Sequence, residues 1–268
     1  MQRFKNRLRL LVKKSHINMN KRYIFFGLMM AITAASAHTV QSEHPVNIGI
    51  AKTKTKAKDT EVRNFNSVAA GGPLQVIVTL GNTEGIRFEG DEEAISTLVT
   101  EVKGSALIIR PKMSWTSWAH KYKDKKIIAY VNAKNISSLT MSGDGSITVK
   151  GTINNNSLTT TLSGSGSISA AVNVQEYTAV VSGSGRLNIT GDAGEVSATI
   201  SGSGVLGKKG ALKVNNLSAR ISGSGSAYVH TNGEINALVS GSGKVYYTGN
   251  ADVSEKKILG SGGVKKLD

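Results

Sequence analysis

The sequence predicts an all-β fold: a single-stranded parallel β-helix with an irregular β cap on its N-terminal side. Three observations lead to this prediction. A Ser-Gly-Ser-Gly motif recurs about every 20 residues in the C-terminal half. Apolar residues alternate with period two on both sides of each motif, which is the pattern of a strand with one buried face. A unit this short cannot bury its apolar side alone, so the units are expected to stack.

The motif also predicts how each coil is oriented. Its copies begin at Ser142, Ser163, Ser182, Ser201, Ser222 and Ser240, within a repeat region of residues 139–264. The alternation does not slip across a motif, so we expect the glycines to face the core and the serines to face solvent. These turn glycines are Gly143, Gly145, Gly164, Gly166, Gly183, Gly185, Gly202, Gly204, Gly223, Gly225, Gly241 and Gly243. Stacking in register predicts an inner ladder of Ala179, Ala198, Ala219 and Ala237, and outer ladders of serine.

The residues before the repeat predict less regular β-structure. We expect strands near Leu74–Leu80, Ile86–Glu89, Leu107–Ile109 and Ile127–Val131, and a short helical turn at Asp91–Leu98. A stack of coils needs a shielded end, because open strand edges pair with other chains. We therefore interpret residues 61–268 as one domain whose first part supplies the N-terminal rungs and the cap.

The N-terminus predicts export. From Met19 the chain has a basic start, an apolar run from Tyr23 and the small residues Ala35-Ser36-Ala37, which is typical of a signal peptide spanning residues 1–37. Residues 1–18 precede a signal that is already complete, which favours translation from Met19. An uncleaved membrane anchor is the alternative. Residues 38–60 are polar and lysine-rich and indicate a flexible leader. We expect the Sec pathway, membrane contact only through the signal, and a final location in the periplasm or on the cell surface.

Charge and cysteine content exclude several classes of partner. The formal net charge is +15, but residues 1–37 hold eight of the 33 basic residues and no acid, so the rest carries 25 − 18 = +7. This moderate and dispersed charge argues against a nucleic-acid partner. The chain has no cysteine, which excludes disulfides and thiolate metal sites. One acid among six turn copies, Asp144, cannot supply a calcium shell, so we expect no metal and no cofactor.

The residues quoted above resemble a known family. The Arg63-Asn64-Phe65 stretch, Leu74–Val78, Gly90-Asp91, Ile127–Val131 and the serine–glycine repeats are similar to the putative autotransporter adhesin family with a head GIN domain, common in Bacteroidetes. The similarity covers about residues 63–264. It implies a right-handed β-helix, export and a surface role. It implies no catalytic residues.

The sequence leaves three functions open. We favour an exported, non-enzymatic β-helix protein of the cell envelope with an adhesin-like role. A polysaccharide-active enzyme would need clustered carboxylates, whereas Asp144, Asp192 and Asp252 are isolated in the repeat. The serine ladders are explained by turn chemistry, although a hydroxyl strip could also contact a glycan.

The remaining function is a glycan-binding module that uses the Trp115/Trp118 loop, within the segment Met113–Lys126. Trp115, Trp118, Lys121 and Tyr122 are its candidate ligand contacts, because aromatic faces beside cations suit sugars and anionic polymers. The partner would be a glycan or another cell-surface polymer. The alternative, which we favour, is that the tryptophans cap the end of the coil while the lysines stay solvated.

Overall fold

The computed structural model describes residues 58–122 and 125–268. The predicted signal peptide and most of the predicted leader lie outside these residues. The last three residues of the predicted leader form strand β1 (Lys58–Thr60), which pairs antiparallel with β4 (Gly85–Gly90). Strand pairing therefore includes residues 58–60, which the sequence assigned to the leader.

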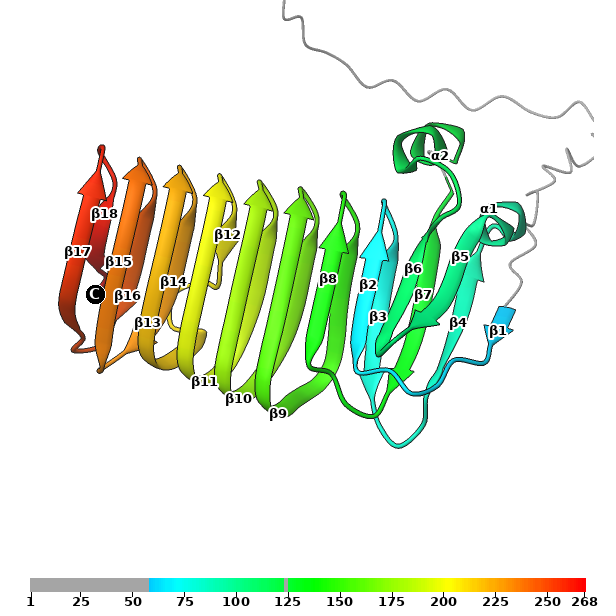
Figure 1. Cartoon of the computed structure of the whole chain (residues 1–268), viewed down its shortest axis with the longest axis horizontal. Coiled ribbons are helices and arrows are strands. Elements are labelled where there is room, and N and C mark those ends of the chain that lie inside the picture. The colour runs from blue at the N-terminus through cyan, green and yellow to red at the C-terminus, as the bar shows by residue number, and fades with distance from the viewer. Residues whose placement is uncertain (1–57, 123–124) are drawn as a thin grey trace, which may run out of the picture. The chain divides into compact units, whose positions relative to one another are not determined.

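The repeat region forms a parallel β-helix of about seven turns, as predicted (Figure 1). The two long faces of the stack meet at the Ser-Gly-Ser-Gly turns, and we call this row of turns the turn ridge. The backbone that leads into the ridge forms the pre-turn sheet, and the backbone that leaves it forms the post-turn sheet. The longest strands run from one turn to the next and contribute to both. The strands are β8 (Ser138–Ser142), β9 (Ser146–Gly164), β10 (Ser167–Gly183), β11 (Arg186–Gly202), β12 (Val205–Leu206), β13 (Leu212–Gly223), β14 (Ser226–Thr231), β15 (Glu234–Gly241), β16 (Lys244–Thr248), β17 (Asp252–Leu259) and β18 (Gly263–Lys266).

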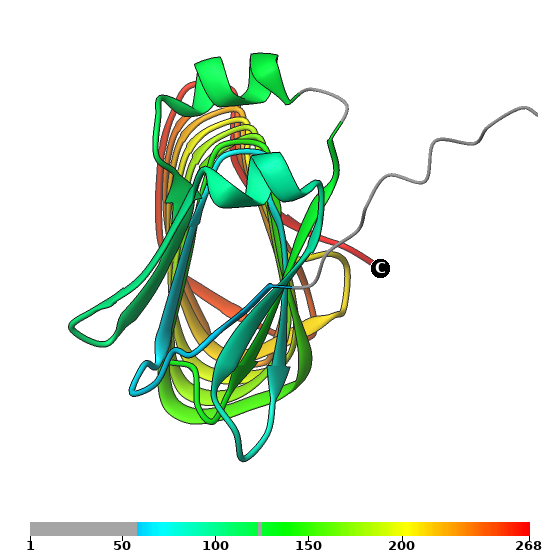
Figure 2. The same cartoon turned by 90° about the vertical axis from the view of Figure 1, so that its right-hand side faces the viewer.

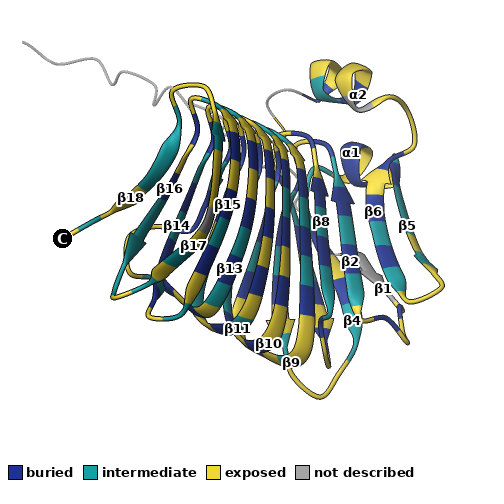
Figure 3. Ribbon diagram, turned by 60° about the vertical axis from the view of Figure 1, so that its left-hand side comes forward, coloured by how far each residue is buried: buried dark blue, intermediate teal, exposed yellow. Residues whose placement is uncertain are grey.

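The register of the strands confirms the predicted ladders. Ala179 pairs with Ala198, Ala198 with Ala219 and Ala219 with Ala237, and all four are buried. The serines that open the motifs pair in the same way from Ser142 to Ser240 and are exposed. Buried and exposed residues alternate along each strand (Figure 3). The period-two pattern therefore fixes which side of each strand faces the core.

The two glycines of a motif differ, and the expectation that both face the core was wrong. The second glycine does face inward: a Cβ at Gly204 would lie 2.3 Å from Val181 Cγ1 in the core. The first glycine has a positive φ, +106° at Gly202, which turns its Cα substituent out of the alternation. A Cβ there would lie 2.6 Å from the carbonyl oxygen of Gly183 in the preceding turn. The first glycine thus permits close stacking of turns along the helix axis.

The N-terminal strands do not stack in chain order. β2 (Ser67–Gly71) lies between β8 and β6 (Ala106–Pro111), while β3 (Gln75–Leu80) lies between β9 and β7 (Ile127–Ala133), all in parallel. The coil made by β2 and β3 is therefore inserted between two coils that follow it in sequence. Gly71-Gly72-Pro73 forms its turn at the ridge, where Gly71 pairs with Ser142.

The cap at this end combines antiparallel strands and two helices. β5 (Leu98–Lys103) pairs antiparallel with β6, and β4 pairs antiparallel with β7. Helix α1 (Glu92–Ser96) begins at Asp91, whose side chain accepts a hydrogen bond from the Ala94 amide at 3.0 Å. β4, β6, β7 and α1 match the predicted strands and helical turn, whereas β5 was not predicted. The segment around the tryptophans, expected to be a loop, instead contains helix α2 (Trp115–Lys121).

A hydrogen-bonded pair of polar side chains lies inside the core. The hydroxyls of Thr160 and Tyr177 are 2.7 Å apart, and these residues are 0% and 1% exposed. Thr160 occupies the ladder position of Ala179, so the phenol of one coil reaches the hydroxyl of its neighbour. Burial raises the pKa of Tyr177, so the phenol stays protonated and the pair stays neutral.

Tyr177→Phe is expected to lower the free energy of unfolding by about 1–3 kcal/mol, because it leaves the Thr160 hydroxyl buried without a partner. Thr160→Val should lower the free energy of unfolding by a similar amount, because it leaves the Tyr177 hydroxyl buried without a partner. The double variant should recover most of the loss, since it leaves no polar group behind. Urea unfolding of the four proteins measures this coupling, and additive losses would contradict it.

Candidate functional site

The tryptophan segment replaces one turn of the ridge. β6 and β7 lie in register beside β2 and β3, so residues 112–126, which connect them, stand where other coils have a short turn. Figure 2 shows α2 at the ridge end of the coils and α1 across the end of the stack. The insertion is therefore part of the cap as well as the predicted site of ligand contact.

The two described aromatic side chains of this segment, Trp118 and Tyr122, pack inward. Trp118 is 1% exposed, and its Nε1 donates a hydrogen bond to Thr97 Oγ1 at 2.7 Å. Tyr122 is 4% exposed, lies 5.2 Å from the Trp118 ring between centroids, and donates to Glu93 Oε1 at 3.1 Å. Trp118 and Tyr122 therefore present no open ring face to a sugar, which favours the capping interpretation for both. The side chain of Trp115 lies outside the described part of the chain.

Two ion pairs connect α2 and the residues after it to α1 and its N-cap. Lys121 Nζ lies 3.0 Å from Glu93 Oε1, and Lys125 Nζ lies 2.8 Å from Asp91 Oδ2. The hydrogen bonds from Lys121 and then Tyr122 lower the pKa of Glu93, and the bond from Lys125 lowers the pKa of Asp91. Lys121, a candidate ligand contact, is thus already engaged by a carboxylate. The four-residue spacing of Trp118 and Tyr122 was the sequence signal for a helix here.

Acid is expected to loosen α2 from α1. Both carboxyl groups have a lowered pKa in the folded state, so their contribution to stability is present above the unfolded values and is lost as the pH falls through the folded ones. The ordinary values are 4.5 for Glu93 and 3.8 for Asp91. In a Trp115→Phe background the fluorescence of Trp118 should stay constant down to the ordinary value of 4.5 and shift to the red as the pH falls further. Glu93→Gln should reduce the shift, and constant emission would contradict the prediction.

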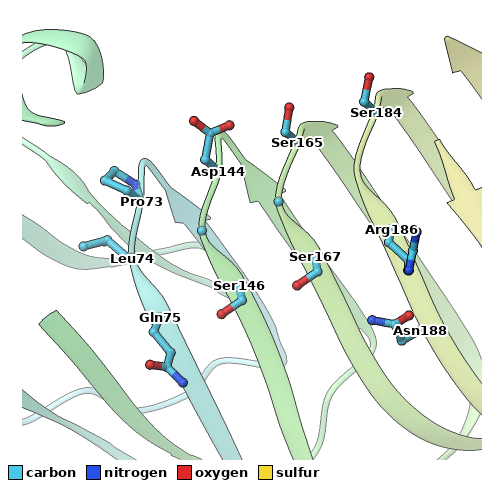
Figure 4. Close-up of a pocket in the computed structure, with 12 residues that line it drawn as sticks. Pro73, Leu74, Gln75, Asp144, Ser146, Ser165, Ser167, Ser184, Arg186 and Asn188 are labelled. Carbon is cyan, nitrogen blue, oxygen red and sulfur yellow. The ribbon is translucent and has the colours of Figure 1, made fainter. Parts of the chain in front are cut away.

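A second candidate site is a shallow groove on the post-turn sheet (Figure 4). Its volume is about 660 Å³, and polar side chains line most of it. Ser146, Ser167 and Arg186 form one row in register, and Asp144, Ser165 and Ser184 form another at the ridge. Gln75 extends the first row toward the cap. Asn188 lies two residues after Arg186 on the same strand, on the side away from the ridge.

This groove can donate and accept many hydrogen bonds. It places one polar side chain per coil, spaced by the strand separation of about 4.8 Å. Asp144 contributes a carboxylate and Arg186 a guanidinium, which is a fixed positive charge. The sequence interpretation omitted Gln75, Arg186 and Asn188, although parity already placed the residue after each motif on the outer side. The groove suits an extended, hydroxyl-rich ligand.

The acids considered for catalysis are not brought together. Asp144 is at the ridge, Asp192 pairs with Asn173 and Lys213 at the opposite corner, and Asp252 begins β17 beside Glu234. In residues 58–122 and 125–268, no three histidine or acidic side chains are grouped closely enough to hold a metal ion. No helix in the same residues has the length and apolar character needed to cross a bilayer.

Several solved structures share this fold. A putative lipid-binding protein of Parabacteroides distasonis is 19% identical, with a TM-score of 0.63 over 80% of this chain and 97% of that one. A putative adhesin of Bacteroides fragilis is 18% identical, with a TM-score of 0.60 over 80% and 97%. Another putative adhesin of Parabacteroides distasonis is 22% identical, with a TM-score of 0.59 over 81% and 98%. No curated protein matches the sequence.

At these identities the solved structures show the fold, and the sequence itself supplies the family. Residues 64–251 match the family described as putative auto-transporter adhesin, head GIN domain. The matched range includes the cap, the inserted coil and the six Ser-Gly-Ser-Gly turns. Because the match spans most of the chain, this protein belongs to the putative auto-transporter adhesin, head GIN domain family.

Proposed function

We propose that this chain is an exported, non-enzymatic protein of the cell envelope that binds an extended surface polymer along its post-turn sheet. The observation that carries the proposal is the in-register row of polar side chains in the groove, one per coil. A polymer with a regular repeat can meet equivalent groups in successive coils. An enzyme site concentrates its chemistry at one point, whereas this groove repeats the same polar chemistry along its length.

Export is supported by the signal-like N-terminus and by the adhesin description of the family. The full chain with a C-terminal tag, fractionated in its own host, is expected in the periplasm or on the surface. A tag found in the cytoplasm would overturn this part of the proposal. The exported protein is then the material for binding measurements.

Binding is tested on a glycan array with two matched double variants. Arg186→Gln with Asn188→Ala changes the groove, while Thr178→Ala with Ser197→Ala changes outer residues of the pre-turn sheet. We expect the first pair to weaken binding about tenfold and the second to leave it unchanged. Equal losses in both, or loss only on Trp115→Ala, would contradict the groove as the binding surface.

The enzymatic alternative has its own test. Asp144 is the carboxylate of the groove, so Asp144→Asn should abolish any polysaccharide cleavage that uses it. We expect the exported protein to release no reducing ends from the glycans that it binds. Release that disappears in Asp144→Asn would replace the binding proposal with a catalytic one.

A further inference from the structure

Two tyrosines on the same post-turn sheet form a stacked pair near its C-terminal end. Tyr228 in β14 and Tyr246 in β16 are partners in register, with ring centroids 4.8 Å apart and planes inclined by 14°. Their neighbours Ala227, Val229 and Val245 are buried, so alternation places both rings on the outer side, where they are half-buried. We call this pair the tyrosine platform.

Positive charge surrounds the platform. Lys244 lies two residues before Tyr246 on the same side of β16. Lys265 is the partner of Tyr246 in the next coil. Among the described side chains, neither lysine has a carboxylate partner. Lys208 and Lys209 protrude from the loop after β12, next to Gly207, which lies against the Tyr228 backbone.

Acidic side chains are scarce in this region. Residues 205–231 and 244–251 contain no aspartate or glutamate. Asp192 is the partner of Lys213, and the main-chain oxygen of Asp268 accepts a hydrogen bond from Lys209. His230, two residues beyond Tyr228, binds Thr248 Oγ1 through Nδ1 at 2.9 Å. The charge around the platform is therefore predominantly positive, which is complementary to an anion.

The platform is continuous with the polar groove. One row of partners runs from Ser167 through Arg186, Val205 and Ser226 to Lys244. Arg186 and Lys244 are three strand steps apart, which is about 14 Å at the usual strand separation. A single extended chain could therefore contact Arg186 in the groove and then Lys244 beside the platform.

We infer that the tyrosine platform, with Lys244, Lys265 and Arg186, binds a linear anionic polysaccharide such as a polyuronate. Sugar rings stack on aromatic faces, and carboxylates along the polymer pair with the spaced cations. Ser226 between the cations, and the exposed ridge serines Ser203 and Ser224 beside it, match the sugar hydroxyls. This inference rests on the proposed function, because it assigns the class of polymer and the part of the sheet that recognises its charge.

The test uses the exported full chain with immobilised polygalacturonate and alginate, and with dextran as a neutral polymer. We expect binding to both polyuronates that weakens with added salt, and little binding to dextran. Lys244→Gln with Lys265→Gln, and separately Tyr228→Ala, should each weaken polyuronate binding about tenfold or more. The matched control, Arg220→Gln with Lys257→Gln, removes the same charge from the outer side of the pre-turn sheet and should retain binding.

Three results would overturn the inference. The first is no binding to either polyuronate, the second is equal loss in the two charge-removing doubles, and the third is equal binding of poly-dT or phosphatidylglycerol vesicles through the same residues. Thermal unfolding shows whether a variant remains folded. If Tyr228→Ala does not remain folded, the double variant Lys244→Gln with Lys265→Gln still tests the inference. Binding of a neutral array glycan without polyuronate binding would refute this inference while the proposed function stands. A cytoplasmic location would refute the proposed function instead.

Discussion

Gly202→Ala is expected to unfold or aggregate the protein. Gly202 has a φ of +106°, a conformation that side-chain-bearing residues rarely adopt. The added Cβ would also lie 2.6 Å from the carbonyl oxygen of Gly183. That oxygen already accepts a hydrogen bond from the Ser203 amide at 2.9 Å, so it cannot move without breaking the contact between coils. Strain and overpacking together should cost about 3–5 kcal/mol, a large part of the stability of a typical domain.

The size of the effect is checked by urea unfolding followed by circular dichroism. Gly183→Val and Gly202→Val should be worse still, because the branched side chain meets the same backbone atoms. Two controls isolate the cause. Ser203→Ala alters an exposed side chain of the same turn and should change stability by less than about 0.5 kcal/mol. Gly81→Ala places a Cβ with no neighbour within 4 Å and should be tolerated. A Gly202→Ala protein as stable as these controls would refute the stacking argument.

Trp118→Ala is expected to destabilise the N-terminal cap by about 3–5 kcal/mol, because it empties a large and fully buried site. The indole touches the Tyr122 ring and holds α2 against Thr97 through its Nε1 hydrogen bond. Its loss should free the insertion and expose the apolar side chains that the indole covers, so aggregation should rise. Trp118→Phe keeps most of the volume and should cost less, mainly the hydrogen bond at about 1 kcal/mol.

Thermal unfolding and size-exclusion chromatography measure these losses. His120→Ala changes an exposed residue of the same helix and should behave like the unmodified protein. Glycan binding gives a separate readout of the alternative role. A Trp118→Ala protein that keeps its melting temperature but loses glycan binding would show that Trp118 is a ligand contact and that the capping assignment is wrong.

Much of the repeat could be read from the sequence because its constraints are local and repeated. Alternation assigns Ala179 and its partners to the inside of every coil, and equal spacing then aligns the coils. The helical turn at Asp91 was also predictable, since a capping aspartate and a short acidic segment are local signals. The candidate site was less predictable. The pattern near Trp118 showed an aromatic and basic segment, but the burial of Trp118 depends on Thr97, which lies 21 residues away.

The sequence by itself determined the β-helix, its period and the sides of its strands, because a two-residue alternation repeated in successive coils permits one orientation. Only the tertiary structure decided the order of the N-terminal coils, with β2 and β3 between strands that follow them. Only the structure distinguished the two glycines of each motif, since a positive φ is set by the neighbouring turn. It also brought Tyr228 and Tyr246 into a stack beside Lys265. These features depend on which coil lies next to which, a choice made by long-range packing rather than by any local run of residues.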